Sequence, residues 1–194
     1  ETDINGNTIH YSYDSFGRLT AVYSPYDNQA GTACLRYSYH TPKQETAAGL
    51  QRWYTITENK VLFEPTDTTV IRTINEIDGL GRTVRTGKTG IVYKDRIKQK
   101  GWNVSGSSAY DAKARAVKTY MTTFVAGQSE QDFLQAPVYH SDTPYTINCY
   151  DGLDRTVEQV LPDNSVYKNV YRIEAGKNVS EQSDPLGNIT VSYS

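Results

Sequence analysis

The chain has 194 residues, 37% of them hydrophobic, and its mean hydropathy is -0.62. Lys and Arg number 20 against 22 Asp and Glu, and this near-balance argues against a dedicated nucleic-acid-binding protein, which would carry a basic face. No stretch of the sequence resembles a transmembrane span or a signal peptide.

The aromatic residues favour strands, because 16 are Tyr against 4 Phe and 2 Trp. A tyrosine ring packs on a sheet while its hydroxyl stays hydrated or hydrogen-bonded. We therefore expect an all-β chain with broad, partly solvated sheet faces in place of one thick core.

The first elements in the chain are predicted to be two strands around a tight turn. Ile9, Tyr11 and Tyr13 alternate along the first strand, and the turn Asp14-Ser15-Phe16-Gly17-Arg18 follows. An Asp at the first position of a type I turn accepts hydrogen bonds from nearby backbone N–H groups. Gly at the fourth position takes a positive φ at little cost, which predicts a three-residue hairpin loop with a bulge.

The same Asp-x-x-Gly-Arg pattern returns along the chain and predicts one repeated unit. Its further members are Asp78, Gly81 and Arg82; Asp111, Ala114 and Arg115; Asp151, Asp154 and Arg155; and Asp184, Gly187 and Asn188. Repeat turns are therefore predicted near 3–7, 14–18, 78–82, 111–115, 151–155 and 184–188. The long interval between the second and third turns predicts an insertion at about 40–70 that holds extra strands and a loop.

Two repeats depart from the pattern at the glycine position. Asp154 is tolerable there, since Asp visits the left-handed region more readily than most residues. A left-handed alanine costs about 1–2 kcal/mol, so we expect the turn at Ala114 to change its type.

Helix is expected in short pieces at most. Thr46–Leu50 could form one turn, and Ser129 with Asp132 makes a loose capping box for a second short helix. Segment 111–125 alternates as a strand does. The basic run Lys94–Lys100 contains an Asp and is interpreted as a solvated loop or an edge strand.

Residues that could bear chemistry do not form a recognisable site. His10, His40 and His140 lack the spacing of metal ligands, and neither a catalytic residue, a cofactor site nor a metal site is predicted. Cys34 and Cys149 are interpreted as two free thiols, although a mutual disulfide stays open.

The repeated residues resemble the Rhs/YD-repeat family, whose unit reads approximately Tyr-x-Tyr-Asp-x-x-Gly-Arg-Leu. The segment Tyr11–Leu19 matches every defined position of that unit. Segments 58–82 and 101–111 are similar to the repeat region of Tc-toxin B-type and virulence-plasmid B-type proteins. The resemblance extends over nearly the whole chain, 1–194, which opens on Glu1 and closes on a strand-like segment, as a piece of a larger protein would.

The resemblance implies a fold and a role. The expected fold is a curved, open antiparallel sheet of successive hairpins, part of a spiral Rhs shell. The implied role is non-catalytic: a secreted or cell-surface bacterial shell whose repeats pair with their neighbours and enclose a C-terminal toxin domain. Such shells can end in a self-cleaving motif that contains Asp-Pro-x-Gly. Asp184-Pro185-Leu186-Gly187 matches these four positions, but it is interpreted as an ordinary repeat turn.

The alternative function is a cell-surface adhesion module that binds a carbohydrate or a receptor. Trp53 and Trp102 are its candidate glycan contacts, since aromatic faces stack on sugars; cross-strand aromatic pairing is the competing interpretation. Free sheet edges also predict self-association of the chain, with strand exchange through the segment 40–52.

Overall fold

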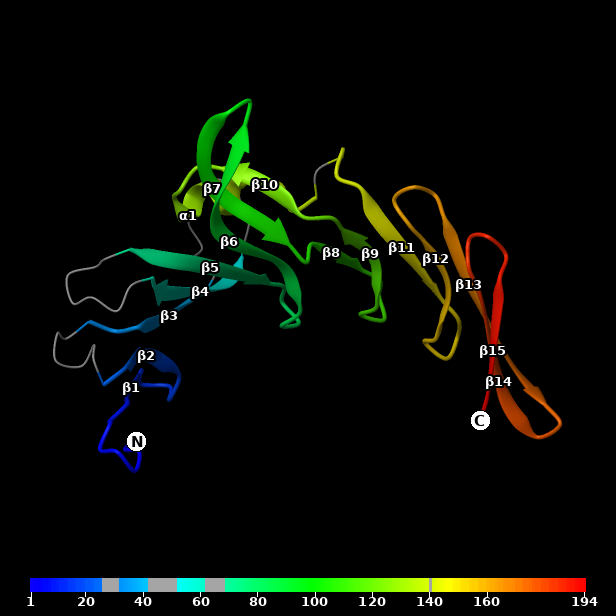
Figure 1. Ribbon diagram of the computed structural model, residues 1–194, viewed down its shortest axis with the longest axis horizontal. Helices are drawn as coiled ribbons and strands as arrows, with labels where there is room; N and C mark the ends of the chain where they lie inside the picture. Colours follow the sequence, from blue (N-terminus) through cyan, green and yellow to red (C-terminus); the bar gives the residue numbers. More distant parts are fainter. Residues whose placement is uncertain (26–31, 42–51, 62–68, 140) are drawn as a thin grey trace. The chain divides into compact units, whose positions relative to one another are not determined.

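The computed structural model describes residues 1–25, 32–41, 52–61, 69–139 and 141–194 (Figure 1). It is 58% strand and 4% helix, in open antiparallel sheets, so the predicted all-β fold class is confirmed. The short helix expected at Thr46–Leu50, most of the 40–52 segment and His140 lie outside the described residues.

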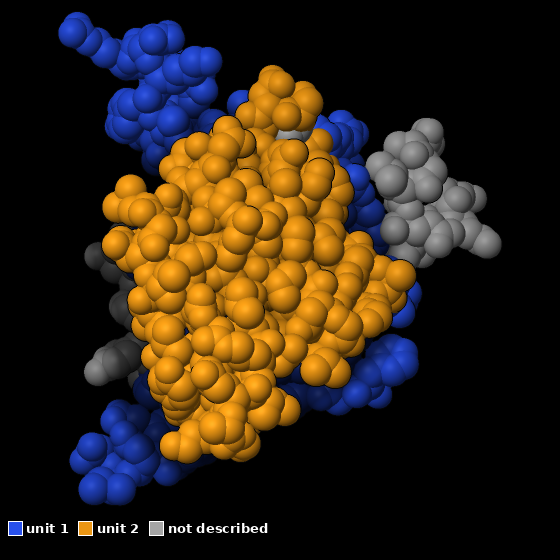
Figure 2. All heavy atoms as spheres, turned by 90° about the vertical axis from the view of Figure 1, so that its right-hand side faces the viewer, with its two compact units in different colours: residues 1–105, 123–137 blue, residues 106–122, 138–194 orange. Residues whose placement is uncertain are grey.

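The chain divides into two compact units (Figure 2). Each unit contains one sheet. Unit 1 comprises residues 1–105 and 123–137, and unit 2 comprises residues 106–122 and 138–194. Both units contain predicted repeat turns: those at 3–7, 14–18 and 78–82 lie in unit 1, and those at 111–115, 151–155 and 184–188 lie in unit 2.

Unit 1 contains an eight-stranded antiparallel sheet in the order β1-β2-β3-β4-β5-β6-β7-β10. The strands are β1 (His10–Tyr13), β2 (Leu19–Tyr23), β3 (Leu35–His40), β4 (Trp53–Lys60), β5 (Val70–Ile77), β6 (Thr83–Lys94), β7 (Ile97–Ser105) and β10 (Thr123–Ala126). Consecutive strands are hydrogen-bonded neighbours up to β7, so the sheet grows hairpin by hairpin along the sequence.

The core of unit 1 is small and lies on one face of this sheet. Ile56 and Ile74 are opposite each other on β4 and β5, and both are buried, as are Trp102 and Val104 on β7. Phe133 covers them from the helix α1 (Glu130–Gln135). Unit 1 therefore has a compact apolar centre only where the helix lies over the sheet.

Helix α1 begins as the sequence predicts. The Ser129 hydroxyl accepts the Asp132 N–H, and the Asp132 carboxylate in turn accepts the Ser129 N–H at 2.8 Å, which completes a capping box. Gly87 on β6 then admits the helix, because a Cβ at this position would lie 2.5 Å from the Phe133 ring.

A buried arginine holds the other end of this helix. Arg85 on β6 is 0% exposed and donates to the carbonyls of Phe133, Ala136 and Pro137 at 3.0 to 3.1 Å. Its Nε donates to the Glu76 carboxylate at 2.8 Å. Helix C-terminal carbonyls lack partners within their own helix, and the last turn of α1 contains no basic residue, so Arg85 supplies both the donors and the positive charge.

Unit 2 contains a seven-stranded antiparallel sheet in the order β15-β14-β13-β12-β11-β9-β8. Its strands are β8 (Ser108–Tyr110), β9 (Ala116–Tyr120), β11 (Tyr145–Tyr150), β12 (Thr156–Val160), β13 (Val166–Glu174), β14 (Lys177–Ser183) and β15 (Ile189–Tyr193). Among the described residues of this unit, Val179 is the one buried hydrophobic residue, so polar contacts rather than a dry core hold its hairpins.

Three further tight turns lie at the opposite ends of strands, where the sequence pattern gave no Asp–Arg signature. Asp95 and Arg96 form the tip of the β6–β7 hairpin with φ of 52° and 63°. Ala175 and Gly176 do the same between β13 and β14. A third turn spans 161–165 and places Asn164 at φ 66°. None of the described helices is both long and apolar enough to cross a membrane.

Candidate functional site

The recurring feature of the chain is a turn built around one aspartate, and the turn at 151–155 shows its geometry. The Asp151 N–H donates to the Arg155 carbonyl at 2.9 Å, and the Asp154 N–H donates to the Asp151 carbonyl at 3.2 Å. Asp151 Oδ1 accepts the N–H groups of Leu153 and Arg155 at 2.9 and 3.0 Å. Asp151 Oδ2 accepts Arg155 Nε at 2.8 Å, so the carboxylate closes the loop from inside.

The same hydrogen bonds recur at the other three Asp–Arg turns. Asp14, Asp78 and Asp111 each accept two backbone N–H groups through Oδ1 and the arginine Nε through Oδ2, all at 2.7 to 3.0 Å. The fourth position of each turn, where the pattern has glycine, has a positive φ: Gly17 at 75°, Gly81 at 79°, Ala114 at 65° and Asp154 at 64°. The structure therefore brings each predicted Asp–Gly–Arg set together.

Two weaker copies close in the same way with asparagine in place of arginine. Asn7 Nδ2 donates to Asp3 Oδ2 at 2.9 Å, and Asn188 Nδ2 donates to Asp184 Oδ2 at 2.7 Å. Gly187 has φ 84° and donates its N–H to the Asp184 carbonyl. The Asp-Pro-Leu-Gly segment thus forms a repeat turn.

The expected change of turn type at Ala114 is wrong. Ala114 keeps the left-handed conformation at φ 65°, and its N–H donates to the Asp111 carbonyl at 3.0 Å, as the glycines do in the other copies. The network around the Asp111 carboxylate and Arg115 supplies enough hydrogen bonds to impose a conformation that costs alanine about 1–2 kcal/mol.

The predicted bulge distinguishes the two classes of turn. The hairpin closed by each Asp–Arg turn has a register shift next to the turn, for example between Cys149 and Tyr150 of β11 against β12. The β14–β15 pairing after the Asp184 turn runs without a shift. A bulge bends its strand and increases the local twist, so we expect the strands beside the arginine turns to be more strongly twisted than those beside the asparagine turn at 184–188.

The turn carboxylates are held in their ionised form. The backbone N–H of Arg18, Arg115 and Arg155 is the largest cause that lowers the pKa of Asp14, Asp111 and Asp151 below the ordinary value. In the asparagine turns the side-chain amide of Asn7 or Asn188 is the largest cause of the lowered pKa of Asp3 or Asp184. A carboxylate that already accepts three hydrogen bonds is poorly suited to act as a general base.

A tyrosine from the next hairpin clasps the arginine of the turn. The Arg155 guanidinium lies 4.3 Å from the ring centroid of Tyr171 on β13. The Tyr171 hydroxyl donates to the Thr156 carbonyl, directly after that arginine, at 3.2 Å. One side chain therefore stacks on the arginine and bonds to the backbone beside it.

This tyrosine clasp is defined by one arginine, the carbonyl after it and one tyrosine. Three copies are seen within the units among the described residues. Tyr39 stacks on Arg18 at 4.4 Å and donates to the Leu19 carbonyl at 2.9 Å. Tyr150 stacks on Arg115 at 4.9 Å and donates to the Ala116 carbonyl at 3.0 Å. The third clasp is that of Tyr171.

The clasp supplies hydrogen bonds just beyond the point where the backbone pairing between two neighbouring strands ends. The last paired residues of β9 and β11 are Lys118 and Ile147, so the Ala116 carbonyl lies beyond the ladder. The Tyr150 hydroxyl and Asn148 Nδ2 donate to it instead, at 3.0 and 3.3 Å. Asn169 and Tyr171 serve the Thr156 carbonyl in the same way. The side chains thus satisfy carbonyls that the splayed strands leave unpaired.

Sequence reasoning found the turns and missed the clasps. The turn residues lie within five positions of one another, whereas Tyr39, Tyr150 and Tyr171 lie on the following strand at separations that vary with the intervening loop. The signal that could have found two of the clasps is the Asn-x-Tyr pattern shared by 148–150 and 169–171.

The glycan-contact prediction is wrong for Trp102. This side chain is 0% exposed, packs against Phe133 at 5.7 Å between ring centroids, and donates its indole N–H to the Ser129 carbonyl at 3.0 Å. Trp102 is buried because helix α1 covers β7 at this point, and it is the largest side chain of the unit 1 core. Trp53 is 44% exposed and remains accessible.

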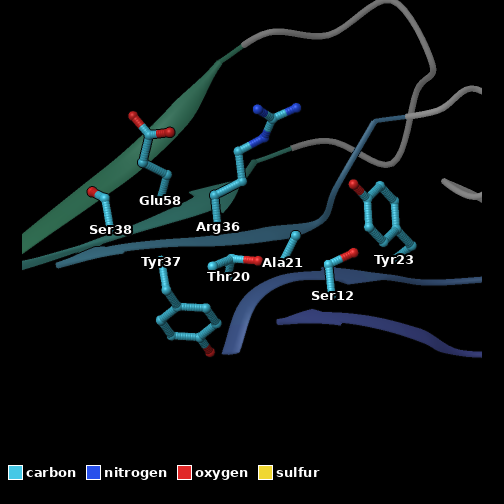
Figure 3. Close-up of a pocket in the computed structure, with 8 residues that line it drawn as sticks. All are labelled: Ser12, Thr20, Ala21, Tyr23, Arg36, Tyr37, Ser38 and Glu58. Carbon is cyan, nitrogen blue, oxygen red and sulfur yellow. The ribbon is translucent and has the colours of Figure 1, made fainter. Parts of the chain in front are cut away.

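A shallow polar hollow of about 410 Å³ lies on the sheet over β1 to β4 (Figure 3). Its lining residues are Ser12, Thr20, Ala21, Tyr23, Arg36, Tyr37, Ser38 and Glu58. The small side chains of Ser12 and Ala21 leave the space, and Arg36 and Glu58 project beside it from opposite positions on β3 and β4. Neither candidate tryptophan lines it.

Within the described residues, no group of three or more His, Cys, Asp or Glu side chains could hold a metal ion. Cys34 and Cys149 are free thiols that lie in different units. His10 lies on β1, and His40 stacks on Tyr54 at 4.4 Å between ring centroids.

The fold and its turns define a repetitive β-hairpin protein, and comparisons with known proteins identify the repeat. The family model named RHS Repeat matches residues 1–29. The chain also shares its fold with the Tc-toxin structures described in the next paragraph. The predicted resemblance to the Rhs/YD-repeat family is therefore confirmed. A search of curated proteins gave no match.

Solved structures of Tc-toxin proteins share the fold of nearly the whole chain. TcdB2-TccC3 matches with a TM-score of 0.65 and 15% identity over 95% of this chain. TcdB2-TccC3-Cdc42 gives 0.65 and 14% over 95%, and the Photorhabdus luminescens Tc holotoxin pore gives 0.65 and 13% over 97%. The chain covers only 10%, 13% and 14% of the respective matched chains.

Proposed function

We propose that this chain is a non-catalytic wall segment of a larger secreted or cell-surface bacterial protein, a β-shell that encloses a C-terminal toxin domain. The observation that carries the proposal is the repeated unit itself: an aspartate turn built from local residues, which in three copies is joined to the next strand of the sheet by a tyrosine clasp. The likeness of fold to Tc-toxin structures over 95% of the chain supports the same role.

The source of stability suits a wall. Eight hydrophobic side chains are buried among the described residues: Ala21, Ala33, Ile56, Ile74, Trp102, Val104, Phe133 and Val179. Local turns close the hairpins instead, and three clasps tie a hairpin to the next strand of its sheet, so a sheet of this kind can grow by adding hairpins without a single deep core. A hollow wall needs this property, since its centre must stay open for a cargo.

The absence of catalysis is part of the proposal. The carboxylates whose pKa is lowered by hydrogen bonds to the chain are mostly those of the repeat turns, where the hydrogen bonds that cause the shift also occupy them. Assays for hydrolytic, nucleotidyl-transfer and redox activity on the purified chain should give no turnover. Turnover abolished by substitution of one Asp, Glu or His would refute this part.

A cell-surface adhesion role is the second candidate, and the exposure of Trp53 favours it. A glycan array probed with the chain would support this role if binding were lost in Trp53→Ala. Trp102→Phe serves as the control, since Trp102 lies in the core.

The enclosing function is tested by limited proteolysis of the longer protein that contains this chain. We expect the segment after the repeats to resist protease in the intact protein and to be cut once Asp111→Ala and Asp151→Ala open the wall. Equal cleavage rates with intact and opened repeats would refute enclosure, whereas an unchanged melting temperature in the double variant would refute the role of the turns.

A further inference from the structure

The β6–β7 hairpin extends past its neighbours as a two-stranded arm, residues 91–100 (Figure 1). The pairing of β5 with β6 ends at Lys88, and the pairing of β10 with β7 begins at Gly101. Between these limits the strand pairing is that of β6 with β7, from Ile91 opposite Lys100 to Lys94 opposite Ile97; at the base of the arm the Lys100 carbonyl also accepts the Gly127 N–H at 3.2 Å. Residues 93–98 are all exposed, so the tip of the arm is uncovered on both faces.

The arm carries a concentration of positive charge in a chain of net charge -2. Its cations are Lys94, Arg96, Lys98 and Lys100, and its acid is Asp95, so its net charge is 4 − 1 = +3. Among the described residues, none of the four cations takes part in an ion pair, although most arginines elsewhere in the sheets do.

Exposed apolar side chains lie between these charges on both faces. Tyr93 is 70% exposed and shares a face with Lys98, whereas Ile97 is 64% exposed and shares the opposite face with Lys94. Ile91 adds a third exposed apolar side chain, at 48%. The tip is thus basic and amphipathic all round.

We propose that this arm binds the surface of a membrane that contains anionic lipid. Lys and Arg near such a surface are attracted to its negative potential, and Tyr with an aliphatic neighbour suits the boundary between headgroups and acyl chains. A headgroup layer surrounds an inserted tip on both faces, as the placement of Tyr93 and Ile97 requires. A protein groove or a nucleic acid would engage one face, and the arm offers one aromatic ring for stacking.

The proposal is independent of the shell function and is tested by flotation of the full chain with vesicles. The chain should float with phosphatidylcholine and phosphatidylserine in equal parts, should release at high salt, and should not float with phosphatidylcholine alone. Lys94→Gln, Arg96→Gln and Lys98→Gln should each weaken binding about fivefold. Lys113→Gln, Lys168→Gln and Lys177→Gln in unit 2 make the same charge change and should leave binding unchanged.

The two faces are tested separately. Tyr93→Ser and Ile97→Ser should each weaken binding, because a membrane contacts both sides of the tip; far-UV circular dichroism verifies that each variant is folded. Loss in one variant alone would overturn the proposal in favour of a one-sided partner. Failure to float, equal loss in the unit 2 variants, or binding to an acidic polymer without binding to vesicles would also overturn it.

Discussion

At the scale of single residues, the aspartate of each repeat turn accepts most of the hydrogen bonds that close the turn. One carboxylate accepts two backbone N–H groups and the side chain of the fifth residue, as Asp151 does. Because these partners lie within the turn, the turn is encoded locally; Gly fits its fourth position best, and Ala114 and Asp154 adopt the same positive φ there. Substitution of Asn for Arg keeps the closing hydrogen bond and loses the guanidinium that a tyrosine can stack on.

The lowered pKa of Asp14, Asp111 and Asp151 predicts that acid destabilises the chain. A carboxyl group whose pKa is lower in the folded state contributes stability above its unfolded pKa, and that contribution is lost as pH falls through the folded value. The melting temperature should therefore decrease as the pH is lowered below about 4.

The acid-induced fall should be smaller in Asp151→Asn, since one titrating turn is removed. Asp95→Asn, at the tip of the hairpin arm, is the matched control and should follow the parent. A melting temperature that does not change in acid would contradict the role of these carboxylates.

Ala114 predicts a stabilising substitution. Ala114→Gly should raise the free energy of unfolding by about 1 kcal/mol, because glycine adopts the left-handed conformation without a Cβ penalty. Asp154→Gly should gain less, since Asp154 Oδ1 accepts Arg115 Nη1 at 2.7 Å and glycine loses that ion pair. Urea denaturation of both variants measures the difference; equal gains would show that the Arg115–Asp154 contact contributes nothing.

At the scale of elements, short range in sequence decides what could be predicted. The turns and the short helix after Ser129 were predictable, because the hydrogen bonds that define them join residues at most five positions apart. The clasps and the burial of Trp102 were not, since both depend on which strand or helix comes to lie alongside. Arg85 could not be predicted to be buried from its residue type: it is a charged side chain that lies beside the core with no exposed surface, because carbonyls at and just after the end of α1, 48 to 52 residues away, accept its hydrogen bonds.

The contact between β6 and helix α1 predicts an intolerant glycine. Gly87→Ala should lower the free energy of unfolding by about 1–3 kcal/mol, because the new Cβ would lie 2.5 Å from the Phe133 ring and push the helix off the sheet. Gly79→Ala is the control, since a Cβ there meets nothing within 4 Å. If the two variants melted alike, the packing of Phe133 on β6 would be refuted.

At the scale of the whole molecule, each of the two units contains an open sheet, with an edge strand at either end of its order among the described residues. Strands β1 and β10 end the sheet of unit 1, and β8 and β15 end that of unit 2. Ile189, Val191 and Tyr193 on β15 are all exposed, so this edge offers unpaired backbone groups beside apolar side chains. The expected route of strand exchange through 40–52 falls mainly outside the described residues.

Self-association through these edges therefore stays a prediction. Sedimentation of the purified chain should show a mass that rises with concentration. Val191→Lys should reduce the rise, because a charge on an edge strand opposes pairing between copies. A compact monomer at every concentration would argue against it.

The central claim is that clasps between successive hairpins hold this chain together, and hydrogen–deuterium exchange tests it most directly. In Tyr150→Phe, which removes only the hydroxyl bonded to the Ala116 carbonyl, amide exchange should accelerate across 115–119 and 146–150 and stay unchanged in unit 1. Tyr167→Phe is the matched control, because no hydrogen bond of the Tyr167 hydroxyl occurs among the described residues, and its exchange should equal that of the parent. Exchange in Tyr150→Phe that cannot be distinguished from this control would contradict the claim.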